Sequence, residues 1–234
     1  MSAGDLSLTE GSGLNSSAPD LSPRARRYAR EERLADLLVH LVGLAAALAG
    51  AVALLVSTRP RTAWALAPIG VYAVALIATF AASAAYNLAF DSRFRPLLRR
   101  LDHSAIFLMI AGTYTPFTTR LVAGWAAVVA TAWIWSMALG GIALKLISPR
   151  LFERLAVLLY LALGWAALAL YPPLAAALHG WPFVLLLAGG ALYSFGLCFH
   201  LREHMRFHNA IWHVFVLAAA SCQYTTILTS VAMH

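Results

Sequence analysis

Long apolar runs alternate along the chain with short polar and basic segments. Each run approaches the roughly 20 apolar residues that a membrane-spanning helix needs. The expected spans are residues 37–56, 63–88, 101–119, 125–146, 155–171, 181–200 and 210–232. This pattern predicts an all-α integral membrane protein, with seven transmembrane helices within residues 31–234. The fifth run is the shortest, so its ends are the least sharply defined.

The composition agrees with this pattern. The chain is 61% hydrophobic and 12% charged, whereas a soluble domain carries about 25% charged residues. Both cysteines lie within apolar runs, so we expect no disulfide framework. Residues 1–30 begin with a stretch rich in Ser, Gly and Pro and end in arginines. We interpret them as a disordered, basic cytoplasmic tail and not as a signal peptide.

The basic residues are distributed unevenly around the apolar runs. Fourteen of the 17 flank the first run or follow the second, fourth and sixth. The positive-inside rule then places the amino terminus in the cytoplasm and the carboxyl terminus outside. Because loop bias explains the net charge of +7, that charge does not indicate nucleic-acid binding. We expect a multi-pass protein of the plasma membrane, which is the inner membrane in a bacterial cell.

Polar side chains gather at the cytoplasmic ends of the first, second, third and seventh expected spans. They are Asp36, His40, Ser83, Asn87, Asp102, His103, Asn209 and His213. Three pairs among them have the i,i+4 spacing that places two side chains on one helix face. Ionisable groups within a membrane usually face the bundle interior and pair with one another. The sequence therefore predicts a polar cluster at this end of the bundle.

Each of these residues also has a purely structural interpretation. Asp36 and Asp102 can cap the helices that they begin. Ser83 and the two asparagines can join neighbouring helices through hydrogen bonds. The histidines closest to the interface can simply be solvated. The coincidence of polar residues at four helix ends is the observation that favours a site.

Several strings resemble the motifs of one family. Residues 102–117, DHSAIFLMIAGTYTPF, are similar to the signature of the hemolysin III family, which is related to the progestin and adipoQ (adiponectin) receptors. AIWHVFVL in the seventh span resembles the carboxy-terminal motif. Residues 83–87 resemble a third motif, with Asn87 in place of the usual His. Residues 31–43 resemble the first motif, with Asp36 where Asn is usual. The resemblance covers about residues 31–228.

The resemblance implies a seven-helix fold with a cytoplasmic amino terminus. It also implies a zinc ion held by one His of span two and two of span seven, near the Asp of span three. Asp102 and His213 match that set, but Asn87 and Asn209 stand at the other two positions. Amide oxygens are poor zinc ligands. We therefore expect a hydrogen-bonded cluster without metal, or alternatively a weak zinc site at His40, Asp102 and His213.

Three functions are compatible with these residues. We favour membrane-lipid homeostasis or sensing through the polar cluster, with membrane lipids as partners, because histidine beside a carboxylate titrates near neutral pH. One alternative is a zinc-dependent intramembrane amide hydrolase similar to the ceramidases, with Asp102 and Ser83 as catalytic candidates. Another is a pore-forming cytolysin, which the family name suggests. The sequence leaves enzymatic activity and oligomeric state open.

Overall fold

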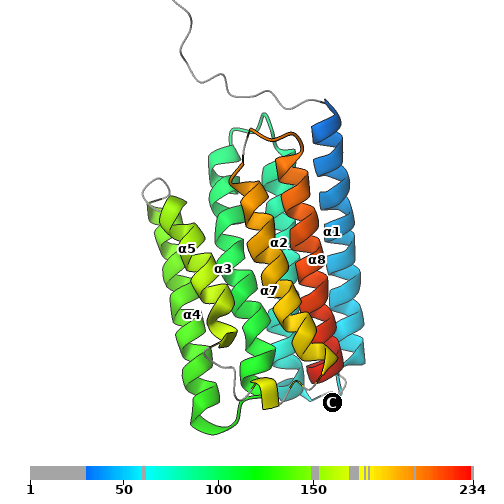
Figure 1. Cartoon of the computed structure of the whole chain (residues 1–234), viewed down its shortest axis with the longest axis vertical. Coiled ribbons are helices and arrows are strands. Elements are labelled where there is room, and N and C mark those ends of the chain that lie inside the picture. The colour runs from blue at the N-terminus through cyan, green and yellow to red at the C-terminus, as the bar shows by residue number, and fades with distance from the viewer. Residues whose placement is uncertain are drawn as a thin grey trace, which may run out of the picture.

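A computed structural model of the chain describes residues 30–59, 62–148, 153–168, 174–176, 178, 180–202 and 204–232. Over these residues all regular structure is helical, and the helices lie side by side along one axis (Figure 1). They are α1 Arg30–Ser57, α2 Ala63–Leu88, α3 Arg95–Arg120, α4 Gly124–Ile147, α5 Glu153–Gly164, α7 Trp181–His200 and α8 His208–Ile227. A short 3-10 helix, Trp165–Leu168, follows α5, and a π-helical turn, Leu228–Ala232, extends α8.

Five helices are long and apolar enough to cross a membrane: α1, α2, α4, α7 and α8 with its π-helical extension. They correspond to five of the seven expected spans, which supports the prediction of a helical membrane protein. The other two expected spans coincide with α3, whose first half carries four charged residues, and with the 12-residue α5. The count of seven spans therefore stays a prediction. The expected tail lies outside the described residues, except that Arg30 begins α1.

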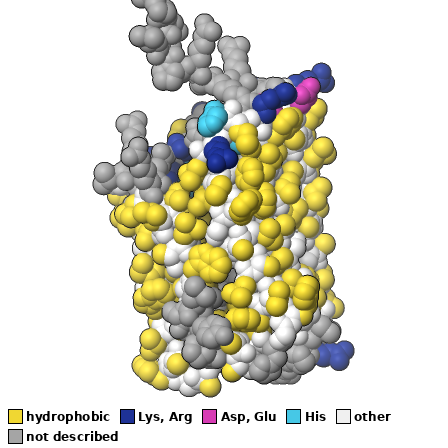
Figure 2. All heavy atoms as spheres, in the orientation of Figure 1, with side chains coloured by type: hydrophobic (Ala, Val, Ile, Leu, Met, Phe, Trp, Pro, Cys, Tyr) yellow, Lys and Arg dark blue, Asp and Glu magenta, His cyan; other side chains and the backbone are white. Residues whose placement is uncertain are grey.

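The surface of the bundle separates apolar from charged side chains. Hydrophobic side chains cover its flanks, and charged side chains gather at the end where α1 begins (Figure 2). Trp64, Val52 and Leu158 are among the large apolar side chains that are more than half exposed. Soluble monomers rarely expose apolar patches larger than a few hundred Å², so an apolar flank of this kind is typical of contact with lipid. We call the end where α1 begins the polar end.

Helices α2 and α3 pack closely in the middle of the bundle. A Cβ atom added at Gly112 of α3 would overlap the Cβ of Ala75 and approach the carbonyl oxygen of Val71 at 3.6 Å. On either side of this contact lie buried side chains such as Tyr72 and Met109. The absence of a side chain at residue 112 thus fixes how near α3 and its polar residues lie to α2.

We expect Gly112→Ala to lower the free energy of unfolding by about 1–3 kcal/mol, because the two backbones must move apart. Gly140→Ala is the matched control, since a Cβ at Gly140 meets no atom within 4 Å. Alanine favours a helix over glycine by up to about 1 kcal/mol, so the control should be neutral or slightly stabilising. Thermal unfolding in detergent measures the stability of both variants. Equal melting temperatures for Gly112→Ala and Gly140→Ala would contradict the close contact between α2 and α3.

The start of α1 is tied to the connection between α7 and α8. The carboxylate of Glu32 is 1% exposed and accepts a hydrogen bond from the backbone N–H of Phe207 at 2.9 Å. Phe207 has φ 57°, in the left-handed region that is costly for a bulky residue. The neighbouring Glu31 forms a solvent-exposed ion pair with Arg206 at 3.2 Å. These contacts hold the first and last helices together at the polar end.

Candidate functional site

Three helices bring most of the predicted polar residues into one cluster. α1 contributes Asp36 and His40, α2 contributes Ser83 and Asn87, and α8 contributes Asn209 and His213. All are buried except Asn209, which is partly buried. The i,i+4 spacing of each pair orients both of its side chains toward the same neighbours. Three of the four helix ends named from the sequence thus meet through these six residues, which we call the polar cluster.

The two imidazoles of the polar cluster have the same orientation. The Nδ1 of His40 lies 2.6 Å from the carbonyl oxygen of Asp36, and that of His213 lies 2.9 Å from the carbonyl oxygen of Asn209. A carbonyl oxygen only accepts, so each Nδ1 carries the proton and each Nε2 keeps a lone pair. Both Nε2 atoms point at the hydroxyl of Ser83, at 3.3 and 3.0 Å. The ring centroids lie 4.3 Å apart.

The two amides of the polar cluster link the helices. The Nδ2 of Asn209 donates to Asp36 Oδ2 at 3.1 Å and to Asn87 Oδ1 at 2.9 Å. The Nδ2 of Asn87 donates to the carbonyl oxygen of Ser83 at 2.9 Å and reaches its hydroxyl at 3.4 Å. Asn209 thus donates to groups on both α1 and α2. Because the two amides are held by these bonds and amide oxygens bind zinc poorly, the residues do not fit the three-imidazole zinc site that the resemblance implies.

Asp102 and His103 lie on α3, beside the polar cluster. Asp102 and Ser83 line the same cavity. His103 instead packs edge-on against Tyr86 and His200, with ring centroids 6.5 Å apart in each case. Because α3 begins at Arg95 and α1 at Arg30, neither Asp102 nor Asp36 caps a helix. The capping interpretation of these two acids is therefore wrong.

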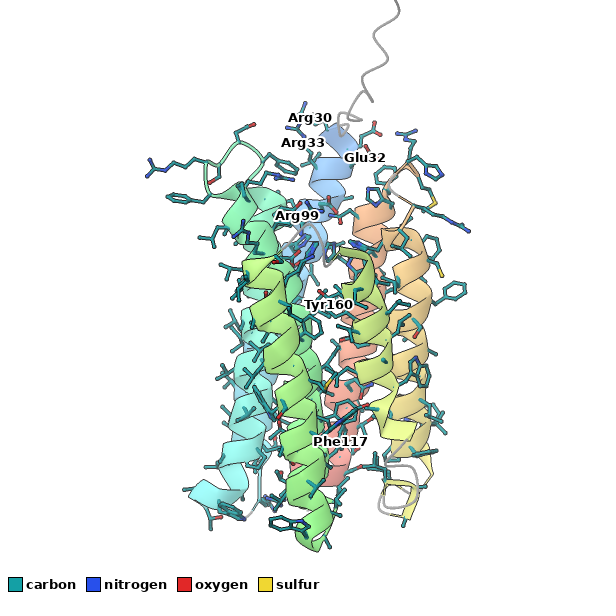
Figure 3. All side chains as sticks on the ribbon, turned by 90° about the vertical axis from the view of Figure 1, so that its left-hand side faces the viewer. Arg30, Glu32, Arg33, Arg99, Phe117 and Tyr160 are labelled. Atoms are coloured by element: carbon teal, nitrogen blue, oxygen red, sulfur yellow. The ribbon has the colours of Figure 1, made fainter. Side chains whose placement is uncertain are left out.

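A cavity of about 560 Å³ lies next to the polar cluster. His40, Ser83, Asp102 and His213 line it at the polar end. Farther along, its walls come mainly from apolar side chains of α3, α5 and α7, among them Ile106, Met109, Tyr160, Phe117 and Leu186. Figure 3 shows Arg99, Tyr160 and Phe117 at successive depths along the bundle. The cavity is thus polar at one end and apolar over most of its length.

Sequence reasoning missed three residues of this cavity. Arg99 and Lys145 line it near the polar end, and Lys145 is only 2% exposed. The Tyr160 hydroxyl donates to the carbonyl oxygen of His103 at 2.8 Å and so joins α5 to α3. A lysine within an expected membrane span was the one available signal, because buried ionisable groups in spans commonly mark sites.

Comparisons with known proteins identify the family of this chain. A family model described as haemolysin-III related matches residues 29–224. The chain is 36% identical over 209 residues to a protein named hemolysin-3 from Bacillus cereus. This alignment covers 88% of the present chain and 94% of the Bacillus cereus protein. The chain is also 32% identical over 199 residues to a hemolysin-3 homolog from Bacillus subtilis (strain 168). That alignment covers 85% of the present chain and 93% of the Bacillus subtilis protein. With most of both chains aligned, the protein belongs to the haemolysin-III family.

Proposed function

We propose that the protein binds a membrane-derived amphiphile in its cavity and serves membrane-lipid homeostasis or sensing. The observation that carries this proposal is the cavity of about 560 Å³, which is polar at one end and apolar beyond it. Binding sites for small molecules commonly enclose about 300–1,000 Å³ and combine apolar walls with a few polar groups. In this proposal the bundle has seven spans in the plasma membrane, and its polar end faces the cytoplasm.

The chemistry of the lining suggests how such a ligand would lie. Arg99 and Lys145 line the cavity at its polar end and suit a carboxylate or phosphate head group. Ile106, Met109 and Phe117 line it farther along α3 and suit an acyl chain. Each methylene group removed from water contributes about 0.8 kcal/mol, although a lipid transferred from the bilayer gains much less. The head group would therefore supply most of the selectivity.

A pore is less well supported than a binding cavity. Outside the polar end the lining is dominated by apolar side chains such as Met109 and Leu186, which do not favour a continuous water-filled path. An amide hydrolase remains the second candidate, because Asp102 and Ser83 line the cavity and a bound amide or ester would lie beside them. In this zinc-dependent alternative, a metal ion would activate the attacking water.

Filling the cavity should abolish lipid binding. Ile110→Trp places a large side chain on the cavity lining, whereas Val128→Trp places it on an exposed site of α4. With a radiolabelled long-chain fatty acid as the probe, we expect Ile110→Trp to bind at least about tenfold more weakly, a loss of roughly 1.4 kcal/mol. Val128→Trp should bind like the wild type. Unchanged binding by a folded Ile110→Trp variant would refute the proposal, as would the absence of copurifying lipid by mass spectrometry.

A further inference from the structure

Three ionisable residues of the polar cluster have the arrangement of a metal site. Asp36, His40 and His213 each offer one ligand atom, and these atoms all lie within 4.8 Å of one another in buried surroundings. We propose that these three side chains bind a divalent first-row transition metal ion, for which Zn²⁺ is the test case. The sequence favoured a cluster without metal, and its alternative zinc set contained Asp102 in place of Asp36. This inference does not depend on the proposed lipid ligand.

The two imidazoles already have the protonation pattern of metal ligands. A metal-binding His commonly donates its other ring N–H to a carbonyl or carboxylate, which fixes the ring and the tautomer. His40 and His213 do so through the carbonyl oxygens of Asp36 and Asn209, at 2.6 and 2.9 Å. Their Nε2 lone pairs converge on one point beside Ser83. No change of tautomer is needed for an ion to bind there.

The polar cluster has more hydrogen-bond acceptors than hydrogens to satisfy them. The Ser83 hydroxyl carries a single hydrogen, yet it faces the Nε2 atoms of both His40 and His213. Asp36 Oδ1 is buried and has no hydrogen-bond partner. Buried acceptors without a donor are costly, especially when charged. A cation among these lone pairs would remove that cost.

The proposed donor set differs from the one that the family resemblance implies. Only His213 is common to both. Asn209, which stands at a ligand position of the implied site, instead donates to Asp36 Oδ2 at 3.1 Å and orients His213 through its carbonyl oxygen. It therefore acts as a positioning residue for two of the three ligands. Two imidazoles and one carboxylate form a common zinc set that leaves a fourth position open, and here that position lies beside Ser83 and the cavity.

The ligand atoms need only a small contraction to hold an ion. Zinc bonds to nitrogen and oxygen are about 2.0–2.2 Å long, which puts ligand atoms of a tetrahedral site roughly 3.5 Å apart. The present separations reach 4.8 Å. Small rotations of the Asp36 and His40 side chains, which lie one turn apart on α1, would close this difference.

The test is the metal content of the purified full-length protein after mild chelation. We expect about one zinc ion per chain in the wild type and in the control His204→Gln, which changes an exposed histidine outside the polar cluster. Asp36→Asn, His40→Gln and His213→Gln should each lose it. Asn209→Ala should bind zinc about 10–100-fold more weakly, as expected for a residue that only orients ligands.

A second measurement needs no variant. Co²⁺ added to the chelated wild type should give the visible absorption of a tetrahedral nitrogen and oxygen site, and Zn²⁺ should abolish that absorption. The proposal is overturned if the wild type binds neither ion stoichiometrically. It is equally overturned if folded Asp36→Asn and His40→Gln proteins retain the wild-type zinc content, because the metal would then lie elsewhere. Neither result would affect the fatty-acid binding experiment, so the two proposals fail separately.

Discussion

Glu32→Ala should lower the free energy of unfolding by about 2–3 kcal/mol, because it removes the buried partner of a backbone N–H. The Glu32 carboxylate is 1% exposed and accepts the Phe207 N–H at 2.9 Å. Without it, this N–H loses a charge-assisted hydrogen bond. Phe207 also keeps its left-handed backbone, with φ 57°, after losing the contact that helps to hold it. The lost hydrogen bond and the unfavourable backbone conformation both act at Phe207, so their costs add.

The neighbouring residue provides the control. Glu31 pairs with Arg206 at 3.2 Å, but the two side chains are 74% and 66% exposed. Exposed pairs contribute about 0–1 kcal/mol, so Glu31→Ala should have little effect. Unfolding in mixed detergent micelles compares the two variants and Glu32→Gln, which keeps an acceptor and should be intermediate. If Glu31→Ala proves as damaging as Glu32→Ala, burial is not what makes Glu32 important.

Asn209→Leu should destabilise the protein by about 2–4 kcal/mol, because it leaves a buried carboxylate without its donor. The Asn209 amide donates to Asp36 Oδ2 at 3.1 Å and to Asn87 Oδ1 at 2.9 Å. Leucine has the same branched shape and the same number of heavy side-chain atoms, but it has no polar hydrogen to donate. Both acceptors would then lose this donor while remaining buried. The loss should appear in EDTA, where no bound metal ion contributes.

A double-mutant cycle identifies the cause of that loss. If the unpaired Asp36 carboxylate is responsible, adding Asp36→Leu to Asn209→Leu should recover part of the lost stability, because both partners are then apolar. Asp36→Leu alone should also be destabilising, since it deprives the Asn209 amide of an acceptor. Strictly additive losses, measured by the same unfolding assay in EDTA, would show that the two residues do not interact.

The sequence predicted the helices and much of the site. Apolar runs and i,i+4 pairs depend on local spacing, so the pairs Asp36 and His40, Ser83 and Asn87, and Asn209 and His213 could be recognised in advance. The distribution of basic residues indicated which helix ends would meet. The structure brings the three pairs together as expected, since ionisable groups in a bundle face inward. Local periodicity and the distribution of basic residues together indicated these pairs.

What the sequence could not predict depends on rotation and relative depth of the helices. α3 begins at Arg95, so Asp102 is not at a helix start, and His103 faces Tyr86 and His200. The resemblance drew attention to Asp102, whereas the acid closest to the two imidazoles is Asp36. The cavity was also unforeseen, because it depends on how completely the side chains of α1 to α5, α7 and α8 fill the space between these helices.

The contacts between α1 and α8 also bear on how the chain is made. Glu32 and Phe207 are 175 residues apart, and Asp36 and Asn209 are 173 apart. At a synthesis rate of about 5–20 residues per second, α8 follows α1 from the ribosome after roughly 10–35 s. For that time the buried acids Glu32 and Asp36 of α1 lack their contacts with Phe207 and Asn209. α1 therefore depends on the insertion machinery, or on water at the membrane surface, until the final helix arrives, and a chain truncated before α8 would expose these acids to cellular quality control.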